Sequence, residues 1–243
     1  MITVKAICSR LQYLAVPLSS SCVFQMACDH FISKARTPLG AALEILGREK
    51  VSNWDSKMTL FLSLVESVLF YGVEVWGGRY LEDIEVVQSR FLKRLLNLPF
   101  STPGCYLRLE TGRLKLKVNA LKRMMKYWIR ILEMKEDRLP RICLTQLVQL
   151  DVRECNLPEL NWATQLRGHL SIIGSDDVCF DADAVTVKRK LLDMCERWEN
   201  HCFSLDIESC PNSRYNNHFP KYALLVQVLY PTLEVSAVRT RRE

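Results

Sequence analysis

The chain has 243 residues, of which 49% are hydrophobic and 25% charged, a composition typical of a folded domain with a sizeable core. It contains only nine glycines and nine prolines, and its apolar residues recur at helical spacing, which favours a mainly α fold over an all-β one. Ten cysteines would suit a secreted protein, but Lys5 and Arg10 interrupt the apolar N-terminal stretch, so we expect an intracellular chain, nuclear or cytoplasmic.

The net charge of +6 is unevenly distributed along the chain. Between Val86 and Arg141 there are fourteen lysines and arginines but only four acidic residues, whereas Leu150 to Cys210 carry twelve acidic and six basic residues. A concentrated basic segment in a folded region is typical of polyanion binding, nucleic acid before membrane, although a solvated surface is the alternative. The change in charge predicts a boundary near residues 151–161.

The first half of the chain predicts a strand-like start followed by helices. Residues 13–17 form a short apolar run that stops at Pro17. From Cys22 to Leu46 apolar residues recur every three or four positions, which predicts one helix or two, interrupted near Pro38 and Gly40.

A core helix is expected next. Ser52 and Asp55 have the spacing of a capping box, and apolar residues share one face from Met58 to Trp76. Glu66 and Glu74 within this stretch would be costly in a bilayer, so we expect a buried helix and no membrane span.

Basic residues gather on the two helices predicted after this one. The first, Leu81 to Asn97, begins with acidic residues and ends with basic ones, as the helix dipole favours. The second, Lys117 to Met134, carries Lys122, Lys126 and Arg130 at four-residue spacing opposite its apolar face. Like charges at this spacing cost a few tenths of a kcal/mol per pair, a cost that a bound phosphate backbone would remove.

The acidic part predicts further helices. A short helix follows Pro140, and a longer one runs from Ala184 to Cys202 with Asp183 as its cap. This part is expected to face away from nucleic acid.

No motif for catalysis or cofactor binding is recognised. There is no phosphate-binding loop, dinucleotide fingerprint or nucleophile elbow. Asp176 and Asp177, which follow Ser175, resemble the paired aspartates of a polymerase metal site only superficially. We interpret Asp176, Asp177, Asp181 and Asp183 as a loop and helix cap. Zinc is not expected either, because the C-terminal cysteines lack a closely spaced pair, and Cys195 and Cys202 have the spacing of small buried residues on one helix face.

Two motifs suggest an ancestry. The Tyr-Gly-x-x-x-Trp-Gly sequence at Tyr71–Gly77 and the Arg-x-Glu-x-Gly sequence at Arg108–Gly112 resemble signatures that follow the polymerase domain in reverse transcriptases of non-LTR retrotransposons. Tyr13–Val16 resembles a third element, with Ala15 where the family has glycine. The resemblance in residue pattern extends over roughly residues 13–210. It implies the thumb and connector, without the palm that holds the catalytic aspartates and without a C-terminal Cys/His knuckle.

The resemblance implies a mainly α helical bundle with a short N-terminal strand or hairpin remnant. Its parts would be a palm-proximal element at residues 1–20, a thumb-like domain with a basic face at 21–150, and an acidic connector at 151–243. The implied partner is RNA or an RNA–DNA duplex, gripped by its backbone without sequence preference. The expected contacts are Arg90, Lys93, Arg94, Arg113, Lys115, Lys117, Lys122, Arg123, Lys126 and Arg130.

Within the two motifs we expect structural residues. Tyr71, Gly72 and Trp76 would pack at the end of a buried helix, and Glu110 would pair with a neighbouring arginine. Two alternatives stay open for the whole chain: a helical module that binds a protein partner through an exposed apolar surface, or an unselected remnant of a degenerate element.

Overall fold

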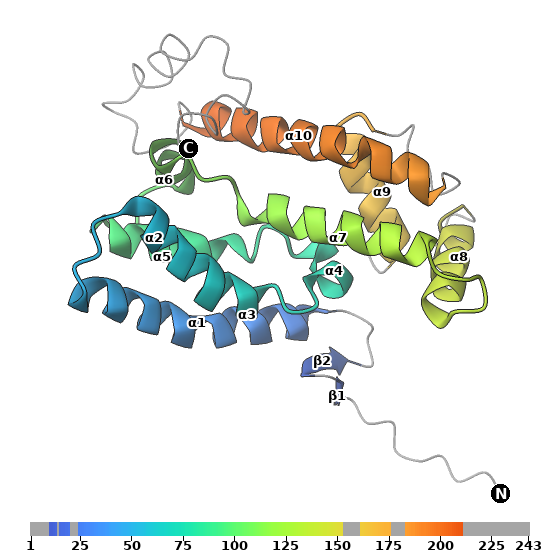
Figure 1. Cartoon of the computed structure of the whole chain (residues 1–243), viewed down its shortest axis with the longest axis horizontal. Coiled ribbons are helices and arrows are strands. Elements are labelled where there is room, and N and C mark those ends of the chain that lie inside the picture. Colours follow the sequence, from blue (N-terminus) through green and yellow to red (C-terminus); the bar gives the residue numbers. More distant parts are fainter. Residues whose placement is uncertain (1–9, 14, 20–23, 153–160, 176–182, 211–243) are drawn as a thin grey trace, which may run out of the picture.

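The computed structural model describes residues 10–13, 15–19, 24–152, 161–175 and 183–210, and it confirms a mainly α fold (Figure 1). Two strands form an N-terminal hairpin, and the remaining elements are helical, including the π-helical η1 and the 3-10 turn η2. The elements are β1 Arg10–Tyr13, β2 Val16–Ser19, α1 Gln25–Arg48, α2 Trp54–Leu60, η1 Phe61–Glu66, α3 Ser67–Leu69, α4 Val73–Trp76, η2 Gly77–Arg79, α5 Glu85–Leu95, α6 Gly104–Thr111, α7 Leu116–Leu132, α8 Leu139–Val152, α9 Trp162–Ile172 and α10 Ala184–Ser209.

Helix α7 lies in the middle of the bundle. In Figure 1, α1 to α5 lie below it, α10 runs above it, and α8 and α9 pack together at its C-terminal end. Its apolar residues between Val118 and Met124 join the core formed by α1 to α5, and Trp198 and Cys202 of α10 belong to this core too. A second cluster around Trp128 joins the end of α7 to α8, α9 and α10. Helices from both sides of the predicted boundary near residues 151–161 therefore share buried surface.

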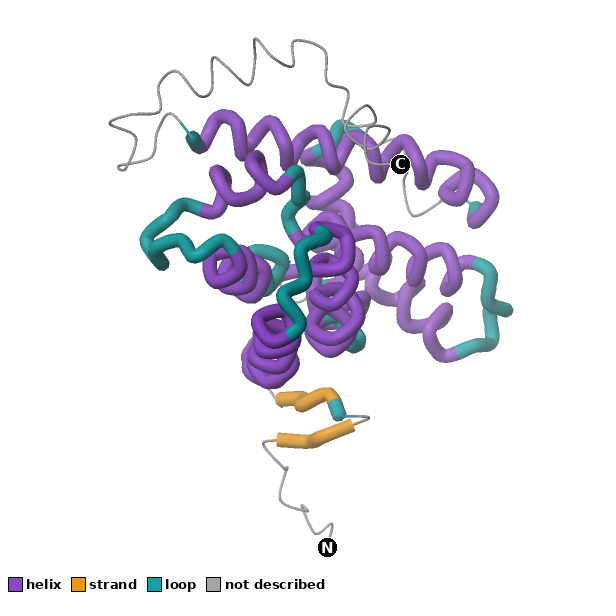
Figure 2. Tube along the Cα trace, turned by 60° about the vertical axis from the view of Figure 1, so that its left-hand side comes forward, coloured by secondary structure: helices purple, strands orange, loops and turns teal. Residues whose placement is uncertain are grey.

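The N-terminal hairpin is antiparallel and lies at the edge of the bundle, beside the start of α1 (Figure 2). Tyr13 pairs with Val16, and Arg10 pairs with Ser19. The turn places Ala15 at a φ of 64°, in the left-handed region that a Cβ disfavours. This is the position at which the family that the motifs resemble is expected to carry glycine.

Ala15→Gly is therefore expected to stabilise the hairpin by up to about 1 kcal/mol, because glycine adopts a positive φ without strain. The measurement is amide hydrogen exchange, with slower exchange expected at the amides that close the β1–β2 ladder. A matched Ala35→Gly variant in the buried face of α1 should destabilise instead, since Ala35 is fully buried in a helix. Faster exchange in Ala15→Gly would contradict the strain argument.

Helix α1 is continuous, so the predicted interruption near Pro38 is wrong. Proline inside a helix costs about 3 kcal/mol because it removes one hydrogen bond and crowds the preceding turn. Here Ala35, Leu39 and Ala42 on either side of it are buried against the core, and their burial outweighs that cost. Gly40 faces open space, so it breaks no packing contact.

The predicted core helix is broken into pieces. Its cap is Asn53, whose side chain accepts a hydrogen bond from the backbone N–H of Asp55 at 2.8 Å, so the predicted cap at Ser52 is wrong by one residue. The helix widens to a π-helical turn at η1, stops at Leu69, and restarts as α4 after Gly72, whose φ is 67°.

No single helix of the described residues meets the length and hydropathy of a membrane span, although the bent pair formed by residues 54–69 and 73–79 meets them jointly.

The later helices follow the apolar periodicity closely. The predictions for α7, α8 and α10 are confirmed, and Asp183 caps α10 by accepting from Thr186 N–H at 3.0 Å. Helix α5 begins only at Glu85, because residues 81–84 form turns, and α10 extends to Ser209. Helices α6 and α9 were not predicted.

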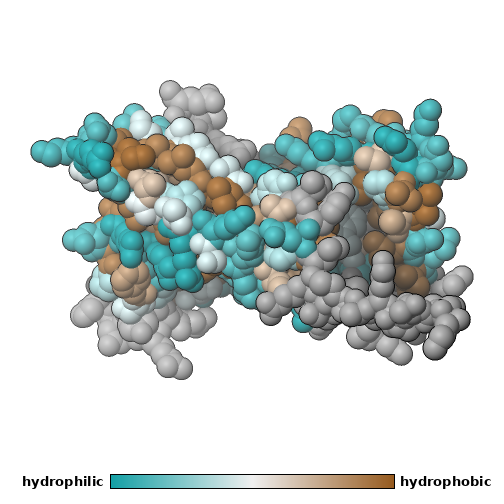
Figure 3. Space-filling view, turned by 90° about the horizontal axis from the view of Figure 1, so that it is seen from below, coloured by the Kyte–Doolittle hydropathy of each residue, from teal (hydrophilic) through white to brown (hydrophobic). Residues whose placement is uncertain are grey.

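The surface is not uniformly polar. Seen from below, the bundle shows hydrophobic areas between hydrophilic ones (Figure 3). Large apolar side chains with more than a third of their surface exposed include Ile45, Leu62, Tyr71 and Val75. Whether such a surface holds a protein partner stays a prediction.

Candidate nucleic-acid interface

The ten predicted contact residues come from three places in the fold. Arg90, Lys93 and Arg94 lie on α5, Arg113 and Lys115 lie in the link between α6 and α7, and Lys117, Lys122, Arg123, Lys126 and Arg130 lie on α7. They do not form one continuous row, because several are buried or bound to acidic residues.

Lys117 and Lys115 are engaged with Glu82. The Lys117 ammonium lies 2.5 Å from one Glu82 oxygen, and that of Lys115 lies 3.6 Å from the other. Burial alone would raise the pKa of the Glu82 carboxyl, but the hydrogen bond and charge of Lys117 outweigh it and hold the pKa below its ordinary value. Lys117 also lies 5.6 Å from the centre of the Trp198 ring, so it stabilises the contact between α7 and α10.

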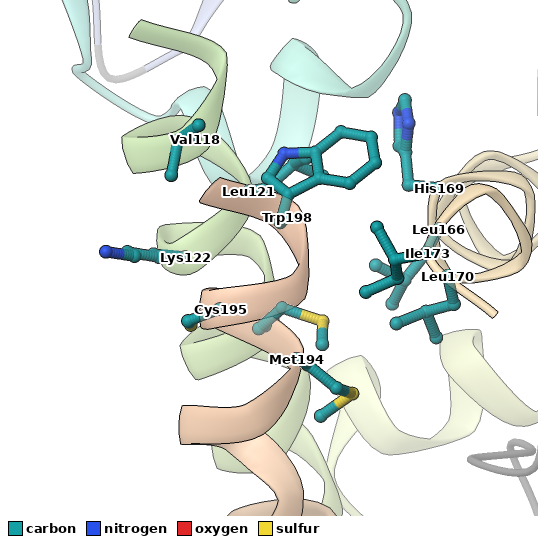
Figure 4. Close-up of a pocket in the computed structure, with 11 residues that line it drawn as sticks. Val118, Leu121, Lys122, Leu166, His169, Leu170, Ile173, Met194, Cys195 and Trp198 are labelled. Carbon is teal, nitrogen blue, oxygen red and sulfur yellow. The ribbon is translucent and has the colours of Figure 1, made fainter. Parts of the chain in front are cut away.

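Lys122 joins α7 to α10 as well. Its ammonium is hydrogen-bonded to the buried carboxylate of Glu199. In Figure 4 its side chain points away from the apolar residues between α7, α9 and α10. Leaving Glu199 buried without a cation would be costly, so Lys122 is committed to this helix pair.

Arg123 and Arg113 lie near Glu66. The guanidinium of Arg123 lies 5.0 Å from the Phe70 ring, and Nη1 donates to the Phe70 carbonyl at 3.3 Å, where α3 ends. Burial raises the pKa of the Glu66 carboxyl, while the charges of Arg113 and Arg123 act in the opposite direction. Both arginines therefore compensate a buried acid, although Arg123 is itself exposed.

An exposed row of cations remains on α7. Arg123, Lys126 and Arg130 are spaced by three and four residues, which places them on one face of a helix. The opposite face is buried in the core. Lys126 and Arg130 make no ion pair with any residue that the structure describes. We call Arg123, Lys126 and Arg130 the α7 row; it replaces the predicted row Lys122, Lys126 and Arg130.

The three basic residues of α5 differ in exposure and in hydrogen bonding. Lys93 Nζ donates to the carbonyl of Phe100 at 2.7 Å and so holds the loop after α5, and burial lowers the pKa of its ammonium. Arg94 is exposed, and Arg90 is half-buried. Their contact with nucleic acid stays a prediction.

Arg108, Glu85 and Asp206 form a buried network that residue spacing in the sequence does not reveal. Arg108 donates two hydrogen bonds to Asp206, at 2.7 and 2.6 Å, and a third to Glu85 at 3.2 Å. The second Glu85 oxygen accepts from the backbone N–H of Leu116 at 2.7 Å. The predicted pairing of Glu110 with a neighbouring arginine is wrong for Arg108, since Glu110 is exposed and Arg108 turns inward.

The Tyr71–Gly77 motif lies at the break between α3 and α4. The indole N–H of Trp76 donates to the Tyr71 carbonyl at 2.8 Å, and the Trp76 ring stacks on Phe31 with 5.7 Å between centres. Gly72 supplies the left-handed turn, and a Cβ at Gly77 would lie 2.5 Å from Val73. Trp76 and Gly72 have the packing roles predicted. Tyr71 packs too, with its ring centre 5.7 Å from that of Phe31, but the side chain is 48% exposed.

The hollow between α7, α9 and α10 is a packing feature. It is lined mainly by apolar side chains around Trp198 (Figure 4), and its volume of about 20 Å³ has room for about one water molecule. His169 closes it through a 2.8 Å hydrogen bond between Nε2 and the Gly78 carbonyl, and burial lowers the pKa of this imidazole.

Cysteines on α10 serve packing too. Cys202 is buried, and burial raises the pKa of its thiol to about 11, which keeps it protonated. Cys195 is half-buried. The described residues contain no group of three potential ligands that could hold a metal ion. Asp176, Asp177 and Asp181 lie outside the described residues.

Comparisons of the chain with protein-family models, with curated proteins and with solved structures found no match.

Proposed function

We propose that this chain is a non-catalytic helical module that binds the backbone of RNA or of an RNA–DNA duplex, as the thumb and connector of the reverse transcriptases that it resembles would hold template and primer. The observation that carries the proposal is the α7 row. Its three cations project from one rigid helix whose other face is anchored in the core.

The geometry of the α7 row suits a phosphate backbone. Arg123 and Arg130 are seven residues apart, which at 1.5 Å per residue is a span of about 10 Å. This is long enough for the row to contact more than one phosphate of a strand. Lysine and arginine contacts to phosphates position a duplex but carry no sequence information, so binding should be sequence-independent.

The buried carboxylates support a structural rather than a catalytic role. Polymerases use closely placed carboxylates to hold two metal ions. In the described part of this chain, Glu85 and Asp206 bind Arg108, and Glu199 binds Lys122. Each of these acids therefore has a cation of the chain itself as its partner.

Replacing Lys126 and Arg130 together by glutamate should weaken binding to an RNA–DNA duplex by about 100-fold at 0.1 M salt, because each phosphate contact releases roughly one counterion. The slope of log K against log salt concentration should fall by about 1.8. Fluorescence anisotropy titrations at several salt concentrations would measure both. Arg123 is left in place because it packs on Phe70.

The control is the double variant Lys34→Glu and Arg36→Glu, which makes the same change in net charge on exposed residues of α1. It should keep the wild-type slope. Equal losses in the two variants would indicate a general charge effect, and an unchanged slope in the α7 variant would rule out the α7 row as the interface.

A further inference from the structure

An apolar groove lies beside α6. It consists of two adjoining hollows of about 370 and about 500 Å³, which share Leu96, Leu98 and Glu110. Leu96 and Leu98 are 38% and 39% exposed, and the neighbouring Phe100 is 67% exposed. We call this the α6 groove. It is lined mainly by Leu96, Leu98, Pro103, Tyr106, Leu107 and Glu110.

The backbone beneath the groove is held by hydrogen bonds. Lys93 donates to the Phe100 carbonyl at 2.7 Å, and the N–H of Leu98 donates to the Lys93 carbonyl at 2.8 Å. The N–H of Thr102 donates to the Pro99 carbonyl at 3.0 Å. The loop therefore presents its apolar side chains from a preformed surface, which lowers the entropy cost of filling the groove.

The end of α10 is fixed to the wall of this groove. The hydroxyl of Tyr106, a groove residue, donates to the Cys210 carbonyl at 2.7 Å. Cys210 is 2% exposed, and one turn earlier Asp206 is held by Arg108. Cys210 therefore lies beside the groove, and residues 211–243 follow it in the sequence.

We propose that residues 222–230 of the same chain, Tyr-Ala-Leu-Leu-Val-Gln-Val-Leu-Tyr, occupy the α6 groove. Eight of these nine residues are apolar or aromatic, which matches the lining of the groove. Lys221 comes directly before them and complements Glu110, the one acidic residue among those that line the groove in the described structure.

The connection is long enough for this placement. Residues 211–221 span at most about 36 Å when extended, which allows the segment to reach either hollow from Cys210. Because the segment is tethered, its effective concentration at the groove is on the order of millimolar, well above that of a partner in trans.

A photo-crosslinking amino acid at position 98 of the full-length chain tests this placement. We expect crosslinks within one chain to peptides from residues 222–230, identified by mass spectrometry. The same amino acid in place of Leu192, which is 79% exposed on α10, is the control and should give no crosslink to residues 222–230, because these occupy the groove. Crosslinks only between two copies of the chain, or no crosslink to this segment, would overturn the proposal.

A second variant tests the apolar match. Leu224→Asp combined with Val226→Asp should reduce the crosslinked product about tenfold and speed amide exchange at residues 96–107, because two charges would enter an apolar groove. The matched variant Val235→Asp with Val238→Asp lies outside the segment and should change neither. An undiminished crosslink in the first variant would overturn the proposal.

Discussion

Arg108→Ala is expected to lower the free energy of unfolding by about 3–5 kcal/mol, because it leaves two carboxylates buried without a cation. The Arg108 side chain is 8% exposed and binds Asp206 through two hydrogen bonds and Glu85 through one. Urea unfolding followed by far-UV circular dichroism measures the loss. A decrease below about 1 kcal/mol, the value of an exposed ion pair, would contradict the buried network.

The pH dependence of this loss gives a second test. Burial raises the pKa of Glu85 even with Arg108 present, and without Arg108 the pKa should rise further. A carboxyl with a raised pKa in the folded state favours folding at low pH, and this contribution is lost as pH rises through that pKa. The difference between wild type and Arg108→Ala should therefore shrink as pH falls from neutrality toward 4.5, the ordinary value for glutamate.

Two controls separate the network from other effects of the substitution. Glu110→Ala removes the exposed acid of the same motif and should cost about 0.5 kcal/mol or less. The apolar triple variant Glu85→Leu, Arg108→Met and Asp206→Leu should recover most of the stability that Arg108→Ala loses, because no charge of this network is left. If the triple variant is as unstable as Arg108→Ala, the loss comes from packing around Arg108 and not from charge.

The helices could be predicted where the signal is local. In α7 and α10 the apolar residues repeat with the period of the helix, and Asp183 stands at the first turn that it caps. Pro38 does not interrupt α1, because the cost of a proline is local whereas the burial that offsets it depends on the rest of the core. Predicting the break at Gly72 would have required knowing that Trp76 stacks on Phe31.

The candidate site was only partly predictable, because charge partners are set by tertiary contacts. Lys122 looked equivalent to Lys126 by spacing, yet its partner Glu199 is 77 residues away. Arg108 was paired with near neighbours in the sequence, whereas Asp206 is 98 residues away. The acidic part was expected to face away from nucleic acid, and it supplies α10, which covers one side of α7. Spacing alone cannot reveal which cations a distant helix neutralises.

Trp76→Ala is expected to lower the free energy of unfolding by about 3–5 kcal/mol, the usual cost of deleting a buried aromatic side chain. Trp76 is 1% exposed, stacks on Phe31, and donates to the Tyr71 carbonyl across the break between α3 and α4. Thermal and urea unfolding measure the change. Trp76→Phe should cost less, about 1–2 kcal/mol, because it keeps an aromatic contact and loses the hydrogen bond.

The other residues of the motif provide a graded control. Gly77→Ala should cost about 1–3 kcal/mol, because its Cβ would lie 2.5 Å from Val73. Tyr71→Ala should cost about 1 kcal/mol or less, since the ring is 48% exposed. If Tyr71→Ala were as damaging as Trp76→Ala, the motif would not act mainly through the buried indole. If instead Tyr71→Ala leaves stability intact but weakens the binding of single-stranded RNA, the exposed ring would extend the interface beyond the α7 row, because aromatic rings stack on unpaired bases.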